Sequence, residues 1–253
     1  MSVTAKRHDR ARQYGWIAAG VAVTWVLIVA ALTGIGKLIM VTRNGNGNLL
    51  GDHTIPHWFA AHRTPALNHW SLIASNLGAT QDILIVSAAT CVVFLAVTRR
   101  WRPVIFVAVV MFGELAAFLT IAAMVKRPRP DVTHLDSKLP TSAFPSGHMA
   151  ATTCLYAGIA ILVIGHARGW WRYLFLIPAI VMPVMIALAR MYRGEHHPTD
   201  ILGSLVFAAL WLTATTMLIK PAKDGLDRAG RAPLGMSRRK STDHSRETAP
   251  ATR

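Results

Sequence analysis

Three polar segments hold most of the side chains that could carry out a reaction in this otherwise apolar chain. They are KRPRPDVTHLD from Lys126, FPSGHMA from Phe144 and ARMYRGEHHPTD from Ala189. Two of them contain arginine and all three contain histidine. Arginine offers a planar, permanently charged fork of donors that suits phosphate oxygens, and histidine can serve as a nucleophile or as an acid and base. The combination indicates chemistry on a phosphate group.

Spacing within two of these segments indicates how the groups are oriented. In PSGH, Ser146 stands where a helix should begin, so it is a candidate N-cap, and the free N–H groups of the first turn could hold an anion. In EHHPTD, Pro198 suits the first position of a helix. Asp200 follows His196 by four residues, so its carboxylate can reach one imidazole nitrogen and leave the other facing outward as a nucleophile. His197 lacks this spacing and is interpreted as a supporting residue.

The composition predicts that these segments belong to an all-α membrane protein. Of 253 residues, 53% are hydrophobic and 15% are charged, and the mean hydropathy is +0.37. This is too apolar for an ordinary soluble domain of this length. Six stretches are apolar and long enough to be transmembrane helices. We therefore expect a polytopic bundle of six transmembrane helices, over residues 16–40, 83–97, 104–125, 149–164, 173–189 and 201–219.

The net charge of +15 could indicate a nucleic-acid partner, but the distribution of the basic residues favours a topological signal. Most of the 27 lysines and arginines lie before the first predicted helix, between the second and third, between the fourth and fifth, or after the sixth. The positive-inside rule then places both termini in the cytoplasm and the first, third and fifth connections outside the cell membrane. The three polar segments meet on this outer face, and no nucleic-acid partner is expected.

The sequence outside the bundle is predicted to form two basic tails. Residues 1–15 and 221–253 are polar and poor in large apolar groups, so both are expected to be disordered and cytoplasmic. Residues 16–220 then form one membrane domain. The second half of its long first outer connection is expected to be an interfacial helix, with Trp58 and Trp70 at headgroup level.

No metal site is expected from the cysteines and the remaining histidines. Cys91 and Cys154 fall within apolar stretches, where they act as small hydrophobic residues without metal-ligand spacing. Four histidines of the first outer connection have spacings that could suggest a site, but no cluster of carboxylates or cysteines accompanies them. These histidines are His53, His57, His62 and His69.

The three polar segments resemble the signature of the type 2 phosphatidic acid phosphatase (PAP2) superfamily, which reads K-x6-RP, then PSGH, then SR-x5-H-x3-D. PSGH is intact at Pro145–His148. The third part is present as Arg190, His196 and Asp200 at the required spacing, with Ala189 where the family usually has serine. The order of the three parts and their placement on the predicted helices also match the family.

The first part of the signature departs from the family pattern. It ends in the required RP at Arg129, but the position of the family's lysine holds Ala122. Lys126 lies one helical turn nearer the surface on the same face, so we expect its ammonium group to replace the missing charge, with Arg127 as the alternative. The resemblance covers about residues 80–220.

The resemblance implies a phosphatase that needs no metal or cofactor and acts through a phosphohistidine. His196 would attack phosphorus while Asp200 holds its tautomer, and His148 would protonate the leaving oxygen and later activate water. The groups implied to neutralise the phosphate oxygens are Arg129, Arg190, Lys126 and the backbone amides of Ser146 and Gly147.

The implied substrate is a lipid phosphate, because a site at the membrane face admits a lipid tail laterally and a headgroup from water. Polyprenyl pyrophosphate, phosphatidic acid and phosphatidylglycerol phosphate all fit, and nothing in the sequence selects among them. The family resemblance, together with the compact six-span architecture, favours an undecaprenyl-type pyrophosphate. Three alternatives remain: a lipid phosphotransferase, a non-catalytic lipid-binding or translocating protein, and a vanadate-dependent haloperoxidase, against which the six apolar stretches argue. The sequence leaves the oligomeric state open.

Glu114 is a charged residue near the middle of the third predicted helix, where a charge is costly. A structural contact and a role on the substrate path are both compatible with this position. Its separation from Ala122 by about two helical turns leaves it outside the predicted site.

Overall fold

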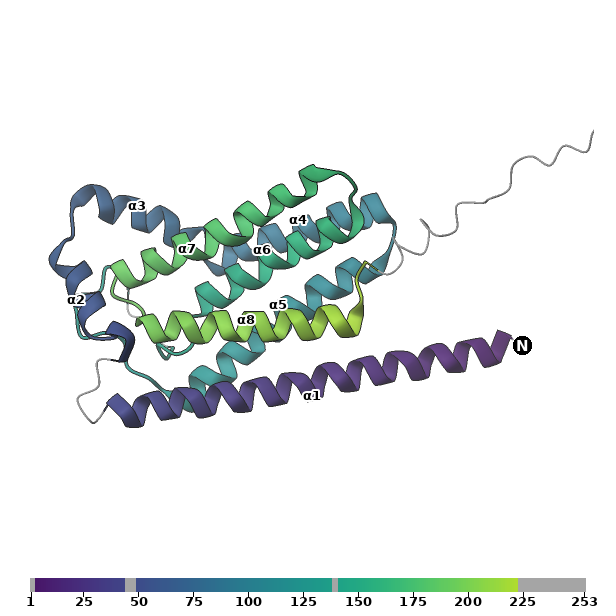
Figure 1. Ribbon diagram of the computed structural model, residues 1–253, viewed down its shortest axis with the longest axis horizontal. Coiled ribbons are helices and arrows are strands. Elements are labelled where there is room, and N and C mark those ends of the chain that lie inside the picture. Colours follow the sequence, from purple (N-terminus) through teal and green to yellow (C-terminus); the bar gives the residue numbers. More distant parts are fainter. Residues whose placement is uncertain (1–2, 44–48, 138–140, 223–253) are drawn as a thin grey trace, which may run out of the picture.

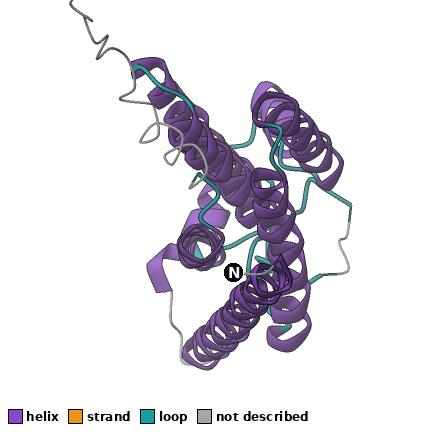
Figure 2. Ribbon diagram, turned by 90° about the vertical axis from the view of Figure 1, so that its right-hand side faces the viewer, coloured by secondary structure: helices purple, strands orange, loops and turns teal. Residues whose placement is uncertain are grey.

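The computed structural model describes residues 3–43, 49–137 and 141–222, and all its regular elements are helices (Figure 2). Six long helices lie side by side, and two short α-helices sit across one end of them (Figure 1). The long helices are α1 (Val3–Arg43), α4 (Thr80–Thr98), α5 (Trp101–Val125), α6 (Gly147–His166), α7 (Leu176–Tyr192) and α8 (Pro198–Ile219). The short elements are the 3-10 turns η1 (Leu49–Gly51) and η2 (Trp170–Phe175) and the helices α2 (Thr54–Ala61) and α3 (Pro65–Asn76).

Six helical stretches of the described chain are long and apolar enough to cross a membrane, which confirms the prediction of an all-α, six-span protein. Large apolar side chains cover their outer surfaces, including Trp16 (74% exposed), Phe112 (70%) and Val97 (78%). Such a surface is unfavourable in water and is accommodated by lipid. The spans are Arg12–Thr42, Thr80–Thr98, Trp101–Val125, Gly147–His166, Trp170–Tyr192 and Pro198–Ile219.

The N-terminal segment differs from its prediction. Helix α1 begins at Val3, so most of residues 1–15 continues the first span as a helix and is not a disordered tail. A polar sequence can extend a helix that has already formed, because each added residue then gains a backbone hydrogen bond without the cost of nucleation. The predicted C-terminal tail lies, from residue 223 onward, outside the described residues.

Helix α6 packs against α5, α7 and α8, while α1 packs against α5 and α8. Two indole groups join these helices. Trp211 of α8 donates from Nε1 to the carbonyl oxygen of Val110 at 3.0 Å, and Trp25 of α1 donates to that of Gly113 at 2.8 Å. Because lipid offers no hydrogen-bond partner, these donors fix the two tryptophans to the backbone of α5.

Phe144 anchors the PSGH segment in the bundle. Its side chain is fully buried between two glycines of different helices. A Cβ atom at Gly36 of α1 would lie 2.8 Å from the Phe144 ring, and one at Gly203 of α8 would lie 2.5 Å from it. The absence of side chains at these two positions therefore allows the ring to fit between the helices and positions the start of α6.

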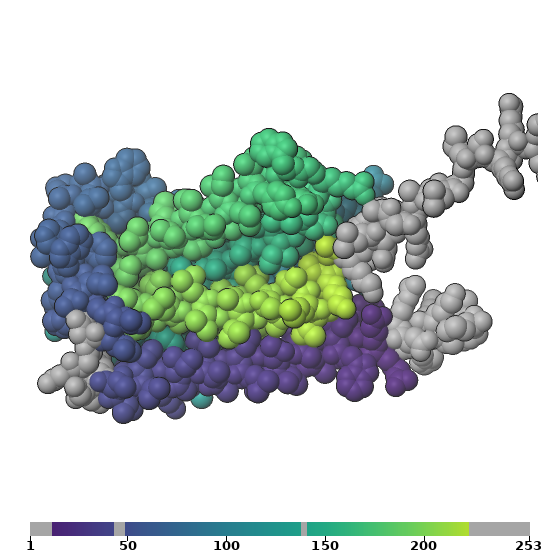
Figure 3. Space-filling view, viewed as in Figure 1, coloured from purple at the N-terminus to yellow at the C-terminus, as the bar shows by residue number. Residues whose placement is uncertain are grey.

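Helices α2 and α3 cover the end of the bundle where α7 ends and α8 begins (Figures 1 and 3). Arg63, between them, donates from Nη2 to the carbonyl oxygen of Tyr192 at 3.0 Å and from Nη1 to that of Thr133 at 2.7 Å. Trp58 and Trp70, which the sequence places at headgroup level, are 57% and 64% exposed. This end of the bundle thus combines fixed polar loops with exposed aromatic side chains.

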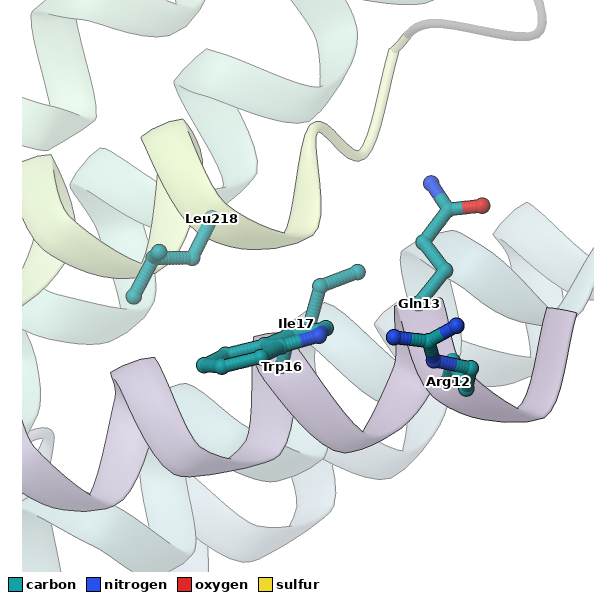
Figure 4. A pocket seen from close by; sticks show the side chains of 5 residues that line it. All are labelled: Arg12, Gln13, Trp16, Ile17 and Leu218. Atoms are coloured by element: carbon teal, nitrogen blue, oxygen red, sulfur yellow. The ribbon is translucent and has the colours of Figure 1, made fainter. Parts of the chain in front are cut away.

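A hollow of about 500 Å³ lies at the opposite end of the bundle, between the start of α1 and the end of α8 (Figure 4). Its lining contains none of the residues that the sequence predicts for chemistry. The lining residues are Arg12, Gln13, Trp16, Ile17 and Leu218.

Candidate active site

The N-terminus of α6 brings PSGH to the covered end of the bundle. Ser146 is the N-cap residue by position, as predicted, but its side chain makes no capping hydrogen bond. Its backbone N–H donates to Ser204 Oγ of α8 at 2.8 Å, which joins α6 to α8. Ser146 Oγ is buried and has no hydrogen-bond partner among the described residues. The start of α6 therefore keeps a free hydroxyl group next to Gly147 and His148.

The turn between α7 and α8 holds His196 in one orientation. Its Nδ1 lies 2.8 Å from the carbonyl oxygen of Ala143 and 3.8 Å from Asp200 Oδ2. A carbonyl oxygen only accepts hydrogen bonds, so Nδ1 carries a proton and donates it to Ala143. In the neutral ring the lone pair is then on Nε2, which is the nucleophilic nitrogen.

Burial lowers the pKa of His196 from its ordinary value, and the charges of Arg190 and Arg129 act in the same direction. The Asp200 carboxylate raises this pKa, but not enough to offset the burial. The imidazole is therefore neutral at neutral pH and its Nε2 is free to attack.

Asp200 binds differently from the sequence expectation, which paired it with His196. The nearer imidazole is that of His197, whose Nδ1 lies 3.1 Å from Asp200 Oδ2 and whose backbone N–H donates to the same oxygen at 2.7 Å. Since α8 begins at Pro198, His197 is the N-cap residue and Asp200 lies in the first turn. A carboxylate at this position accepts from the residue before the helix, so helix geometry favours the three-residue spacing.

Asp200 and Asp52 form a buried ion network around Arg127. Arg127 Nη1 donates to Asp200 Oδ1, and Nη2 donates to Asp52 Oδ2. Asp52 also accepts from the Thr199 backbone N–H at 3.0 Å and from its hydroxyl at 2.6 Å. Asp52 was missing from the predicted site, because this carboxylate between the first two spans belongs to no motif. Through Thr199, Asp52 joins the segment before α2 to the first turn of α8.

Two arginines that the sequence predicts for phosphate binding are held by carboxylates. Arg190 Nη1 donates to Asp136 Oδ2 at 2.6 Å. Arg129 Nη1 donates to Glu195 Oε2, and the same oxygen lies 3.7 Å from Arg190 Nη2. Burial alone would raise the pKa of Asp136, but the hydrogen bonds and charges of Arg193 and Arg190 outweigh it and lower this pKa. Asp136 is therefore a carboxylate at neutral pH, and each of these arginines faces a carboxylate.

A cavity of about 420 Å³, here called the site cavity, connects this polar cluster with the interior of the helix bundle. Its polar end contains the predicted nucleophile, the predicted acid and both arginines, and its other end runs between α4 and α5. An anion in this end would meet imidazole and guanidinium groups together, which is the arrangement needed for transfer of a phosphoryl group. The predicted residues that line it are Arg129, Gly147, His148, Arg190 and His196.

The structure does not bring Lys126 to the site cavity. Helix α5 ends at Val125, and Lys126 turns the chain with a left-handed backbone (φ 54°), which leaves its side chain exposed. The prediction for Lys126 requires the helical face of α5 to continue to this residue, but the helix has already ended there. Arg127, the alternative, is buried against Asp52 and Asp200 and does not line the cavity either.

Glu114, which does not belong to the predicted site, lines the same cavity. The cavity extends down α5 from the level of His148 to that of Glu114.

No group of three or more His, Cys, Asp or Glu side chains in the described part of the chain could hold a metal ion.

Six apolar helices with a buried arginine and histidine cluster at one end define a polytopic membrane protein with a cavity lined by these side chains. A family model described as "PAP2 superfamily" matches residues 83–223, more than half of the chain. The chain belongs to this superfamily, which confirms the resemblance drawn from the three motifs.

Similar proteins include two from Bacillus subtilis (strain 168). Undecaprenyl-diphosphatase BcrC is 27% identical over 155 residues, which are 58% of this chain and 76% of that protein. Phosphatidylglycerophosphatase B is 27% identical over 151 residues, which are 58% of this chain and 73% of that protein.

A solved structure has the same fold. It is the crystal structure of a transmembrane PAP2 type phosphatidylglycerolphosphate phosphatase from Bacillus subtilis. The TM-score is 0.63 at 23% identity, and the match covers 82% of this chain and 96% of that one.

We expect His196 to remain neutral, with its proton on Nδ1, at about pH 6, where an ordinary histidine with a pKa of about 6.5 is mostly protonated. The burial that lowers its pKa is the reason. Nitrogen-15 NMR of histidine-labelled protein would show this state, and the signal is identified by its loss in His196→Gln. An imidazolium signal at that pH would contradict the assignment.

Asp52→Ala should lower the free energy of unfolding by about 3 kcal/mol, because it removes one carboxylate from buried Arg127 and the acceptor of the Thr199 N–H. Unfolding in detergent, followed by tryptophan fluorescence, measures the effect. Asp131→Ala is the matched control, since Asp131 is exposed. Equal unfolding midpoints for the two variants would show that the network does not stabilise this end of the bundle.

Proposed function

We propose that this protein is a lipid phosphate phosphatase that acts through a phosphohistidine intermediate. One observation carries the proposal: His148, His196, Arg129 and Arg190 line the polar end of a cavity whose remaining length is mostly apolar. Such a cavity fits an amphiphile with an anionic head, because the head meets guanidinium groups while the tail stays among helices. The superfamily membership and the names of the two relatives support the same class of reaction.

In the first step, Nε2 of His196 attacks phosphorus, the N–P bond forms and the bond from phosphorus to the leaving oxygen breaks. His148 gives a proton to that oxygen. The 2.8 Å hydrogen bond from His196 Nδ1 to the carbonyl oxygen of Ala143 fixes the orientation of the ring. Asp200 Oδ2, 3.8 Å from Nδ1, stabilises the positive charge that develops on the imidazole.

In the second step, His148 takes a proton from water, the resulting hydroxide attacks phosphorus and the N–P bond breaks, which releases phosphate. Arg129 and Arg190 neutralise the phosphate oxygens in both steps. To do so they must exchange their present partners, Glu195 and Asp136, for the substrate. The free hydroxyl of Ser146 and the amide of Gly147 are further donors for the same oxygens.

The substrate class is a lipid that carries a phosphate or pyrophosphate, and an undecaprenyl-type pyrophosphate is one candidate. The printed names of the two relatives include an undecaprenyl diphosphatase and a phosphatidylglycerophosphatase. We place the site on the outer face of the cell membrane with both termini in the cytoplasm, because most basic residues flank the opposite ends of the spans. Transfer of the phosphoryl group to another lipid is the alternative outcome of the same first step.

His196→Ala should lower phosphate release from lipid phosphates at least about a thousandfold, because it removes the nucleophile of a covalent mechanism. The assay uses purified protein in detergent with EDTA present, since the proposed chemistry needs no metal. His69→Ala, on the exposed surface of α3, is the control. Unchanged turnover in His196→Ala would favour a non-catalytic lipid-binding role, and a phosphorylated lipid product in place of free phosphate would identify a phosphotransferase.

Arg129→Ala should lower kcat/KM by about a hundredfold or more, because it removes one of two guanidinium groups at the polar end of the site cavity. Lys126→Ala should stay within about twofold of the unaltered protein, as expected for an exposed side chain that does not line the site cavity. Steady-state kinetics with one lipid phosphate compare the two variants. A loss in Lys126→Ala that equals the loss in Arg129→Ala would restore the sequence prediction for Lys126.

A further inference from the structure

The apolar part of the site cavity contains two polar groups that the proposed reaction does not use. Glu114 of α5 and Ser87 of α4 both line it. They are 3% and 9% exposed, and neither Glu114 Oε1 nor Ser87 Oγ has a hydrogen-bond partner among the described residues. Two helices thus each contribute an unpartnered polar atom to the same cavity.

The two groups lie at similar depth in the bundle. Helices α4 and α5 pack against each other and are joined by the short turn at residues 99–100. Counted from this turn at 1.5 Å per residue, Ser87 and Glu114 both lie about 20 Å along their helices. Both therefore face the cavity in the middle of the membrane-spanning region.

Unpartnered polar groups at this depth are costly. A hydroxyl or carboxyl group without a hydrogen bond in an apolar environment loses the interactions that water would give, and no lipid chain replaces them. Alanine or leucine would avoid this cost at either position. A ligand with hydrogen-bond acceptors that enters the cavity would remove it, because Ser87 and a protonated Glu114 each offer an O–H donor.

The position of Glu114 relative to the phosphate site indicates which part of a ligand it meets. Phe118 follows Glu114 by one turn of α5, and a Cβ atom at Gly147 would lie 3.0 Å from Cζ of Phe118. Glu114 therefore lies within about one helical turn of the level of the first residue of α6. In a glycerolipid phosphate, the two ester carbonyl groups lie a few bonds from phosphorus, whereas a prenyl chain has no polar atom beyond its pyrophosphate.

We infer that Glu114 and Ser87 form a polar subsite that binds the ester carbonyl groups of a glycerolipid phosphate. The inference rests on the proposed function, since it assumes that the phosphate occupies the polar end of the cavity. It deepens that function by selecting ester-bearing lipids over prenyl pyrophosphates. Two O–H donors in an otherwise apolar wall match two carbonyl acceptors at the start of two acyl chains.

A matched pair of lipids tests the subsite: dioleoyl phosphatidic acid and its di-ether analogue, which lacks only the two carbonyl oxygens. We expect the unaltered protein to bind and hydrolyse the diester roughly three- to tenfold better, as one or two hydrogen bonds predict. Glu114→Leu and Ser87→Ala should each reduce this ratio toward one. Glu114→Gln keeps a donor and should retain the ratio, and Leu119→Ala, which lies on α5 outside the cavity lining, should not change it.

Undecaprenyl pyrophosphate provides the second arm, because Glu114→Leu should not lower its kcat/KM if the subsite recognises carbonyl groups. An equal loss with the prenyl and diester substrates would mean a structural role for Glu114 and would overturn the subsite. Equal treatment of the diester and di-ether lipids by the unaltered protein would overturn it as well. The dissociation constants of the diester and di-ether lipids, measured with His196→Ala protein, test the subsite independently of turnover. Absence of phosphate release from every lipid would instead refute the proposed function itself.

Discussion

The rest of the site depends on the interactions of the buried Asp200 carboxylate with Arg127 and with the backbone of His197. It is fully buried and accepts from Arg127 and from the N–H of His197, so the charge is paired and its remaining lone pairs are satisfied. Removing either Asp200 or Arg127 would leave the other charge buried without compensation. The free-energy cost of such a charge is much larger than the net stabilisation that the ion pair provides. The network therefore fixes the first turn of α8, and with it the turn that carries His196.

Charge balance explains how several arginines can be buried near one another. Arg129 and Arg190 face Glu195 and Asp136, and Arg127 faces Asp52 and Asp200. The two pairings differ in function. The carboxylates around Arg127 form an internal network that does not line the site cavity, whereas Glu195 and Asp136 occupy donors of the two arginines that do line it. An incoming anion therefore exchanges one set of charge-assisted hydrogen bonds for another.

The sequence predicted the parts of this structure that follow from local patterns. Near-continuous apolar stretches identify the six spans because a membrane requires them, and the motifs identify His148, His196, Arg129 and Arg190 as neighbours. The Asp52 contact joins residues 147 positions apart and has no local pattern, so the sequence could not indicate it. Lys126 was misplaced because the helical face was continued past Val125, where a left-handed residue ends the helix.

The absence of the family's lysine affects how much the polar groups deep in the cavity contribute to lipid binding. With Ala122 in place of lysine and Lys126 exposed, the polar end of the cavity has two guanidinium groups to attract an anion. Fewer charges at the head leave a larger share of the binding free energy to the rest of the lipid. An apolar wall recognises any hydrocarbon tail of suitable size, so it discriminates weakly, whereas a buried donor that lacks a partner strongly disfavours a ligand without an acceptor. We therefore expect selectivity among lipid phosphates to depend more on Glu114 and Ser87 than on the residues proposed to bind the phosphate group.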